Sequence, residues 1–262
     1  MKRLVLPLIL GACFLLPGCT APVDDAPALS LVEENVYQFQ DGETLSTWQF
    51  PDDNKLIYCL EDGTELLAVS LSHDPGYAVS ALDSDAQAQI LSFYAQQGAQ
   101  YDLEEYLEQA YLEYIQTQPR SDFQCYLIEQ SVQPGGCNDH LIYFSTVLML
   151  PITRTESESD VLTQAFEKET GAAIDSWSLF SGSKEEVTAA FLSEGMIAPD
   201  LLETAAEQFD PRYIRWDTDG CEVLFPAALA DQLGTGGFSA PYTEELLAVL
   251  HDWAIPTANQ PT

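Results

Sequence analysis

Carboxylates are the most abundant side chains in this chain that could do chemistry. The 262 residues include 42 Asp and Glu but only three histidines, His73, His140 and His251. Two carboxylates at a suitable separation can support glycoside hydrolysis, and histidine titrates near neutral pH. With so many acids any pair can be chosen, so their number carries no specificity. Each histidine also has a carboxylate beside it, but neighbouring residues of a strand point to opposite faces, so adjacency predicts no catalytic dyad.

Sequence strings that mark catalytic or cofactor sites are absent. The chain contains no GxSxG, no HExxH, no Walker loop and no complete GxGxxG, and it has no CxxC to accompany its scattered histidines. The glycines of "GTGG", residues 234–237, predict a turn rather than a phosphate cradle. We therefore predict no catalytic residue, no metal site, no cofactor and no enzymatic activity. The alternative is a carboxylate-dependent cell-wall hydrolase or modifying enzyme.

A covalent modification of the chain is predicted at Cys19. A basic start, "MKR", precedes an apolar stretch from Leu4 to Leu16, which is the layout of a secretory signal and is too short for a spanning helix. The string "LLPGC" resembles the bacterial lipobox, which implies signal cleavage after Gly18 and diacylation of Cys19. Two acyl chains anchor a protein far better than one. We expect a bacterial membrane-anchored lipoprotein with its folded part outside the cytoplasm; the alternatives are a cut before Cys13 and an ordinary secretory signal.

The net charge restricts the partners of the exported part. Nine Lys and Arg against 42 acids give −33, and loss of Lys2 and Arg3 with the signal leaves 7 against 42, or −35. Nucleic-acid binding needs cations that displace condensed counterions, so this charge excludes it. A cationic protein would instead be attracted. An acidic surface also keeps an exported protein soluble, which is the simpler explanation of the charge.

Four further cysteines follow Cys19. They are Cys59, Cys125, Cys137 and Cys221. An exported location permits disulfides, and four cysteines allow three pairings. If "QPGG", residues 133–136, is the turn of a hairpin, Cys125 falls opposite about Phe144 and Cys137 opposite about Val132. The two would not face each other, as a bridge requires, and the pairing stays open, as does the oligomeric state.

Local patterns predict an α+β protein. Its antiparallel sheets are expected to consist of a meander and hairpins, with helices packed on them. Short apolar runs separated by Asp-Gly turns predict a meander over residues 30–80. Two helices are expected over 83–98 and 102–119, the first with Asp83 or Ser84 and the second with Asp102 as its N-cap. A strand pair then flanks residues 133–136. Its second strand, 140–150, is apolar on both faces, which is typical of a central strand.

The chain is predicted to fold as two sub-domains of similar design behind the anchor. The string "RTESESD", residues 154–160, has the composition of an exposed loop and gives the boundary. Ser183 and Glu186 form a predicted capping box for the next helix. The predicted segments are a signal peptide at 1–18, a tether at 19–30, sub-domains at 31–153 and 154–253, and a tail at 254–262.

The segment "AFEKETGAAIDSWSLF", Ala165 to Phe180, resembles part of the extracellular domain of RsiV-type lysozyme-sensing anti-sigma factors. The same domain of unknown function accompanies PdaC-type peptidoglycan deacetylases. The resemblance covers about residues 161–250, although the GGAH string common in the family's N-terminal half is missing. It implies a Thr-Gly turn between two strands and an inward-facing Leu-Phe pair. The residues carried over as structural are Thr170, Gly171, Leu179 and Phe180, and no catalytic residue is carried over.

These observations together predict a non-enzymatic, surface-tethered lipoprotein. Its RsiV-like extracytoplasmic domain is expected to act as a sensor or binding module. The expected partners are the membrane, through the lipid on Cys19, and a cationic protein such as lysozyme or a component of the cell envelope. A structural component of a surface assembly is a further alternative.

Overall fold

The chain begins with an antiparallel meander that forms one half of a large sheet. The computed structural model describes residues 29–50, 54–153 and 155–259. Strands pair in sequence order, and the turns between them include Gly42 and Gly63, both with positive φ as Asp-Gly turns favour. The strands are β1 (Ser30–Gln38), β2 (Thr44–Gln49), β3 (Lys55–Leu60) and β4 (Glu65–Leu71). The predicted meander is confirmed.

Helices connect β4 to the next strand, β5 (Tyr126–Cys137), and the two strands pair in parallel. A parallel neighbour needs such a crossover because a hairpin can join only antiparallel strands. The connection contains α1 (Tyr77–Ser80), α2 (Ser84–Gln97), α3 (Leu103–Gln116) and the short 3-10 helix η1 (Arg120–Asp122). The carboxylate of Asp102 caps α3 by accepting hydrogen bonds from two backbone N–H groups. Both longer helices are predicted, and the structure confirms them.

Two long hairpins complete the sheet, whose order is β1 to β8. The strands are β6 (Leu141–Thr153), β7 (Glu156–Glu167) and the short β8 (Ala173–Ile174). The predicted turn at residues 133–136 is wrong, because β5 continues to Cys137 and the chain reverses at Asn138–His140. Cys137 therefore pairs with Ile142 rather than with Val132. The glycines serve close packing instead, since a Cβ on Gly136 would lie 2.6 Å from Cβ of Pro256.

The exposed loop predicted at residues 154–160 is also wrong. Residues from Glu156 onward belong to β7, which pairs with β6 from its first residue. Their alternating serines and carboxylates suit a strand whose side chains are largely exposed. A continuous hairpin therefore crosses the expected boundary between the two sub-domains, and β7 and β8 belong to the large sheet.

The remaining residues, 176–256, form a separate layer that we call the C-terminal lobe. It contains a three-stranded antiparallel sheet of order β11, β10, β9. Its elements are η2 (Ser176–Leu179), α4 (Lys184–Glu194), α5 (Leu202–Glu207), η3 (Pro211–Tyr213), β9 (Ile214–Trp216), β10 (Gly220–Leu224), α6 (Ala227–Leu233), β11 (Gly237–Pro241), α7 (Glu244–Ala248) and η4 (Asp252–Ala254). The capping box of Ser183 and Glu186 at α4 is present, as the sequence predicts. In the described part of the chain, no helix is long and apolar enough to cross a membrane.

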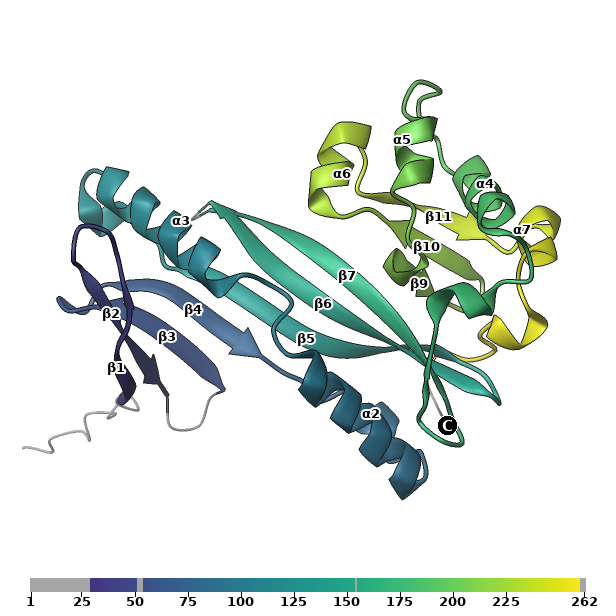
Figure 1. Ribbon diagram of the computed structural model, residues 1–262, viewed down its shortest axis with the longest axis horizontal. Coiled ribbons are helices and arrows are strands. Elements are labelled where there is room, and N and C mark those ends of the chain that lie inside the picture. Colours follow the sequence, from purple (N-terminus) through teal and green to yellow (C-terminus); the bar gives the residue numbers. More distant parts are fainter. Residues whose placement is uncertain (1–28, 51–53, 154, 260–262) are drawn as a thin grey trace, which may run out of the picture.

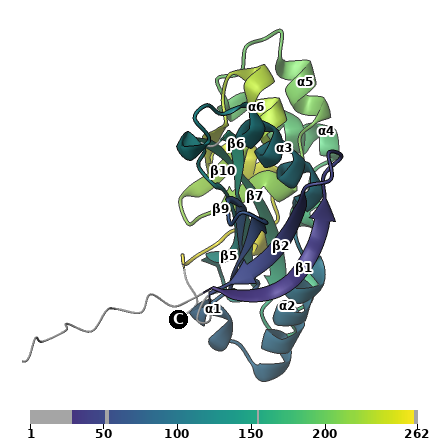
Figure 2. The same ribbon diagram turned by 90° about the vertical axis from the view of Figure 1, so that its left-hand side faces the viewer.

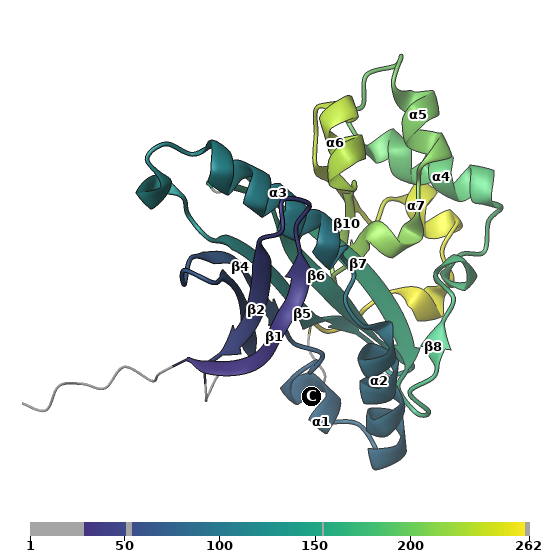
Figure 3. The ribbon, with the colours of Figure 1, turned by 60° about the vertical axis from the view of Figure 1, so that its left-hand side comes forward.

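Strand β6 carries the core on both of its faces. Ile142 and Phe144 pack with α2, and Leu148 and Leu150 belong to the cluster beneath α3. On the opposite face, Tyr143 joins the core of the C-terminal lobe. Figures 1 and 3 show the result: α2 and α3 cover one face of the sheet, and the lobe packs near β7, away from the meander. Figure 2 shows β1, which forms the edge of the large sheet opposite to β8.

Two fully buried tyrosines allow a matched test of this core. The hydroxyl of Tyr143 donates to the carbonyl of Ala254 at 2.7 Å, whereas that of Tyr94 finds no partner among the described residues. Tyr143→Phe is expected to lower the free energy of unfolding by about 1–2 kcal/mol, because a buried carbonyl loses its donor. Tyr94→Phe is expected to leave it unchanged or raise it by up to ~1 kcal/mol. Urea unfolding of both variants measures the difference, and a larger loss for Tyr94→Phe would contradict the assignment.

The four cysteines of the described ranges are free thiols, and no disulfide joins them. Burial raises the pKa of Cys59 to about 11 and that of Cys221 to about 12. Because these folded-state pKa values exceed the unfolded value, the two thiols lower the free energy of unfolding only above about pH 8.5. Their effect grows as the pH rises toward 12. We expect thiol reagents at pH 8 to label these cysteines only after unfolding, as checked by peptide mapping. Fast native labelling of Cys221 would contradict its burial.

Candidate functional site

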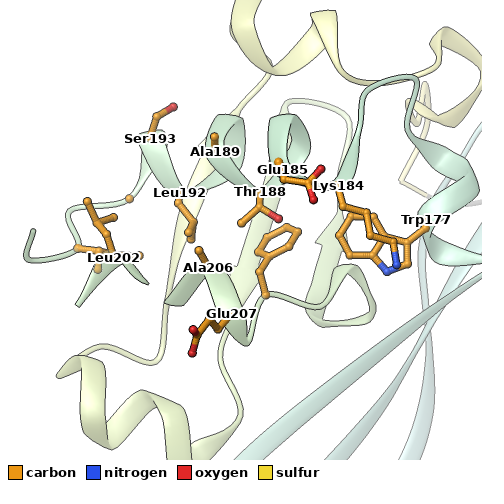
Figure 4. A pocket seen from close by; sticks show the side chains of 13 residues that line it. Trp177, Lys184, Glu185, Thr188, Ala189, Leu192, Ser193, Leu202, Ala206 and Glu207 are labelled. Carbon is orange, nitrogen blue, oxygen red and sulfur yellow. The ribbon is translucent and has the colours of Figure 1, made fainter. Parts of the chain in front are cut away.

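A concavity lies between α4 and α5 in the C-terminal lobe. This groove has a volume of about 750 Å³, within the range of small-molecule and peptide sites. Figure 4 shows Trp177 and Lys184 at one end and Leu202 and Ser193 at the other. Apolar side chains predominate along it, with Glu185 and Glu207 among the polar ones. An apolar floor with charged groups on its rim is the composition of a binding groove.

Local sequence signals fix the α4 wall of the groove. The hydroxyl of Ser183 accepts a bond from the N–H of Glu186, whose carboxylate in turn accepts from the N–H of Ser183 at 2.8 Å. The bond to this N–H lowers the pKa of Glu186. At the other end α4 stops before Gly195, where a Cβ would lie 2.9 Å from the ring of Phe238. Both ends of the helix are therefore fixed, and the exposed Ala189 on its outer turn lines the groove.

Packed aromatic rings form the floor beneath one end of the groove. Trp177 contacts Phe180 and Phe209 at centroid distances of 5.9 and 6.1 Å, and Phe180 meets Phe191 edge-on at 5.8 Å. The Nζ atom of Lys184 lies 4.7 Å from the centre of the Trp177 ring. A cation–π contact of this kind holds the indole in place.

The surface around the groove is strongly acidic. Residues 175–252 carry 15 acidic side chains and three cations. Arg212 forms an ion pair with Asp210, and Arg215 forms one with Glu222, each with a nitrogen–oxygen distance of 2.6 Å. The hydrogen bond to Asp210 raises the pKa of Arg212. Lys184 is the third cation and is stacked on Trp177. Carboxylates thus outnumber cations by twelve, and all three cations already have a partner within the chain.

The β1–β2 and β3–β4 turns and the end of α3 line a second, acidic concavity of about 570 Å³. The guanidinium of Arg120 lies 5.0 Å from the centre of the Tyr114 ring. The charge of Arg120 also contributes to a lowered pKa of Asp62, after the larger effect of hydrogen bonds from Thr64. This surface therefore combines carboxylates with tyrosine rings around a basic side chain that the chain itself supplies.

The structure places the sequence-predicted residues as follows. Cys19 and Gly18 lie outside the described residues. Thr170 and Gly171 form the turn between β7 and β8, and Leu179 and Phe180 are buried, with 2% and 6% of their surface exposed. Phe180 packs against Trp177, so Phe180 supports the aromatic floor of the groove. No sequence pattern indicates the groove itself, because it forms only where α4 and α5 pack beside each other.

The three histidines lie in three different loops or turns of the structure. In the described ranges no three side chains of His, Cys, Asp or Glu converge as metal ligands. His73 lies in the loop after β4, and His251 stacks on Trp253 at a centroid distance of 5.5 Å. His140 lies in the turn between β5 and β6, beside a pocket that does not include the other two histidines.

Comparisons with known proteins give structural neighbours alone. No family model and no curated protein matches the chain, so its resemblance to the lysozyme-sensing domains stays a prediction. A member of the DUF3298 family from Bacteroides fragilis is similar to it with a TM-score of 0.39 and 13% identity, covering 87% of this chain and 94% of that one. A DUF3298 family protein from Pseudomonas aeruginosa PAO1 gives 0.35 and 11%, with coverages of 89% and 98%. Both of these solved structures are DUF3298 family proteins.

Proposed function

We propose that this chain is a lipid-anchored, extracytoplasmic binding module for a cationic protein. The observation that carries the proposal is the groove between α4 and α5, an apolar channel with carboxylates on its rim. The module itself performs no catalysis. The lipid on Cys19 would hold it at the membrane, and the C-terminal lobe would present the groove to the partner.

The groove fits apolar side chains of a partner segment. Leu202 on its rim has 39% of its surface exposed, and Met196, between two lining residues, is fully exposed. Isolated exposed apolar residues are ordinary, but two beside one groove form a surface that a partner can cover. Apolar anchors inserted between two helices are a common mode of peptide recognition.

Charge selects the partner and directs its approach. Glu185 and Glu207 are exposed on the two helices that border the groove, and the whole chain carries −33. A cationic protein is therefore steered toward this surface, and the contribution weakens as salt screens it. Lysozyme is cationic and is sensed by the RsiV-type proteins whose domain residues 161–250 resemble, so it is the first partner to test.

The test compares two arginine variants that change the net charge equally. Ala189→Arg fills the groove and adds a cation to its wall, whereas Ala95→Arg adds the same cation to an exposed position of α2. Calorimetry with lysozyme and the purified full chain is expected to show about tenfold weaker binding for Ala189→Arg, or ~1.4 kcal/mol. Ala95→Arg is expected to change the affinity by less than about twofold, because it changes only the long-range field.

Two results would contradict the proposal. Equal losses for the two variants, with no binding left at about 0.15 M salt, would reduce the interaction to general charge attraction. New soluble products after incubation of the chain with purified peptidoglycan would show an enzyme instead.

A further inference from the structure

A pocket separate from the groove lies where the β5–β6 turn, the β7–β8 turn and η4 meet. Its volume is about 620 Å³, within the range of about 300–1,000 Å³ typical of small-molecule sites. The lining side chains that can make polar or stacking contacts are Asp139, His140, Glu167, Glu169 and Trp253. All five are exposed to solvent, so a ligand could reach each of them.

A buried asparagine fixes the two walls of this pocket. The Oδ1 atom of Asn138 accepts hydrogen bonds from the N–H groups of His140 and Leu141 at 2.8 and 3.0 Å. Its Nδ2 atom donates to the carbonyls of Trp253 and Ile255 at 2.8 and 2.9 Å. Asn138 is only 8% exposed. One amide therefore joins the β5–β6 turn to the C-terminal segment that carries Trp253, and the pocket is preorganised.

Trp253 provides a flat surface at the pocket. Its ring lies parallel to that of His251, with an interplanar angle of 15°, and 37% of the residue is exposed. An exposed indole supported by a second ring is a rigid apolar platform that loses little conformational freedom when a ligand stacks on it.

Hydrogen-bonding groups surround the platform. Asp139, Glu167 and Glu169 offer carboxylate oxygens, which accept hydrogen bonds, and the imidazole of His140 can donate one. The hydroxyl of Thr170 donates to Glu167 at 2.5 Å and orients this carboxylate. A ligand that matches this lining has one apolar face and a rim of hydroxyl donors. The surrounding negative charge disfavours an anionic ligand.

We propose that this pocket binds an uncharged saccharide. The less polar face of a sugar ring stacks on Trp253, and its hydroxyl groups donate to Asp139, Glu167 and Glu169. The site is distinct from the groove between α4 and α5, so a glycan and a cationic protein bind to different parts of the chain.

The experiment measures binding of three tetrasaccharides to the purified full chain by calorimetry. The probes are the tetramer of N-acetylglucosamine, the tetramer of glucose and the cationic tetramer of de-N-acetylated glucosamine. An uncharged tetramer is expected to bind with an affinity that changes little between about 0.05 and 0.3 M salt. Trp253→Ser and Glu169→Gln are each expected to weaken it about tenfold or more.

Matched controls separate this site from general effects on the fold. Tyr77→Ser removes another exposed aromatic ring, and Glu207→Gln neutralises a carboxylate of the groove; both are expected to leave saccharide binding unchanged. Lysozyme binding should in turn be unaffected by Trp253→Ser, so failure of one proposal leaves the other standing. The inference is overturned if only the cationic tetramer binds and salt abolishes its binding, if no tetramer binds, or if the controls weaken binding as much as Trp253→Ser.

Discussion

Replacing Gly171 with alanine is expected to lower the free energy of unfolding by about 3 kcal/mol, the combined cost of backbone strain and overpacking. Gly171 has a φ of +71° in the turn between β7 and β8. A Cβ there would clash with the carbonyl oxygen of Ala86 and lie 2.8 Å from the Cα of the same residue. Both are backbone atoms of α2, so no side-chain rotation relieves the clash, and the turn or the helix must move.

Gly234→Ala is the control for this prediction. Gly234 has nearly the same φ, +68°, in the left-handed helical region, but a Cβ there meets nothing within 4 Å. Its loss should be limited to about 1 kcal/mol of conformational strain. Urea unfolding followed by circular dichroism gives both values. Equal losses would show that the close contact between the β7–β8 turn and α2 contributes nothing.

Asn138→Ala is expected to have the second large effect, again about 3 kcal/mol, because the four backbone groups bonded to this side chain lose their partner together. The same variant should also weaken saccharide binding, since the segment of Trp253 is no longer tied to the β5–β6 turn. Thermal or urea unfolding measures the first effect, and calorimetry of the folded variant measures the second.

Two further variants refine this prediction. Asn138→Asp keeps the acceptor oxygen but places a buried carboxylate oxygen against the carbonyls of Trp253 and Ile255, so at neutral pH it should destabilise the fold at least as much as alanine. Asn259→Ala, at an exposed position, should change stability by no more than about 0.5 kcal/mol. The assignment of Asn138 fails if its alanine variant is no less stable than that of Asn259.

Elements with strong local signals could be predicted from the sequence. Asp102 before α3, and Ser183 with Glu186 at α4, are capping residues whose hydrogen bonds close within three positions of the chain. Asp-Gly pairs likewise predicted the turns of the meander. In each case the information lies within a few residues of the feature, so the sequence alone contains it.

Features that depend on distant residues could not be predicted. Pro134, Gly135 and Gly136 have the composition of a turn, yet they lie inside β5 because Pro256 packs against Gly136. Asn138 is one polar residue among many until its partners, 115 and 117 positions away, are known. The groove is likewise a product of how α4 and α5 pack, and neither helix shows it alone.

The parallel pairing of β4 with β5 also sets the order in which the sheet can be completed. β1 to β4 are joined by short turns and can pair early, whereas β5 becomes available only after residues 72–125 have followed. Closing so long a segment is slower and costs more entropy than closing a hairpin. A chain that folds from its N-terminus therefore holds β4, with its apolar Leu66, Leu67 and Val69, as an open edge for part of its folding. β4 is consequently open to wrong pairing during this interval, until β5 covers its edge.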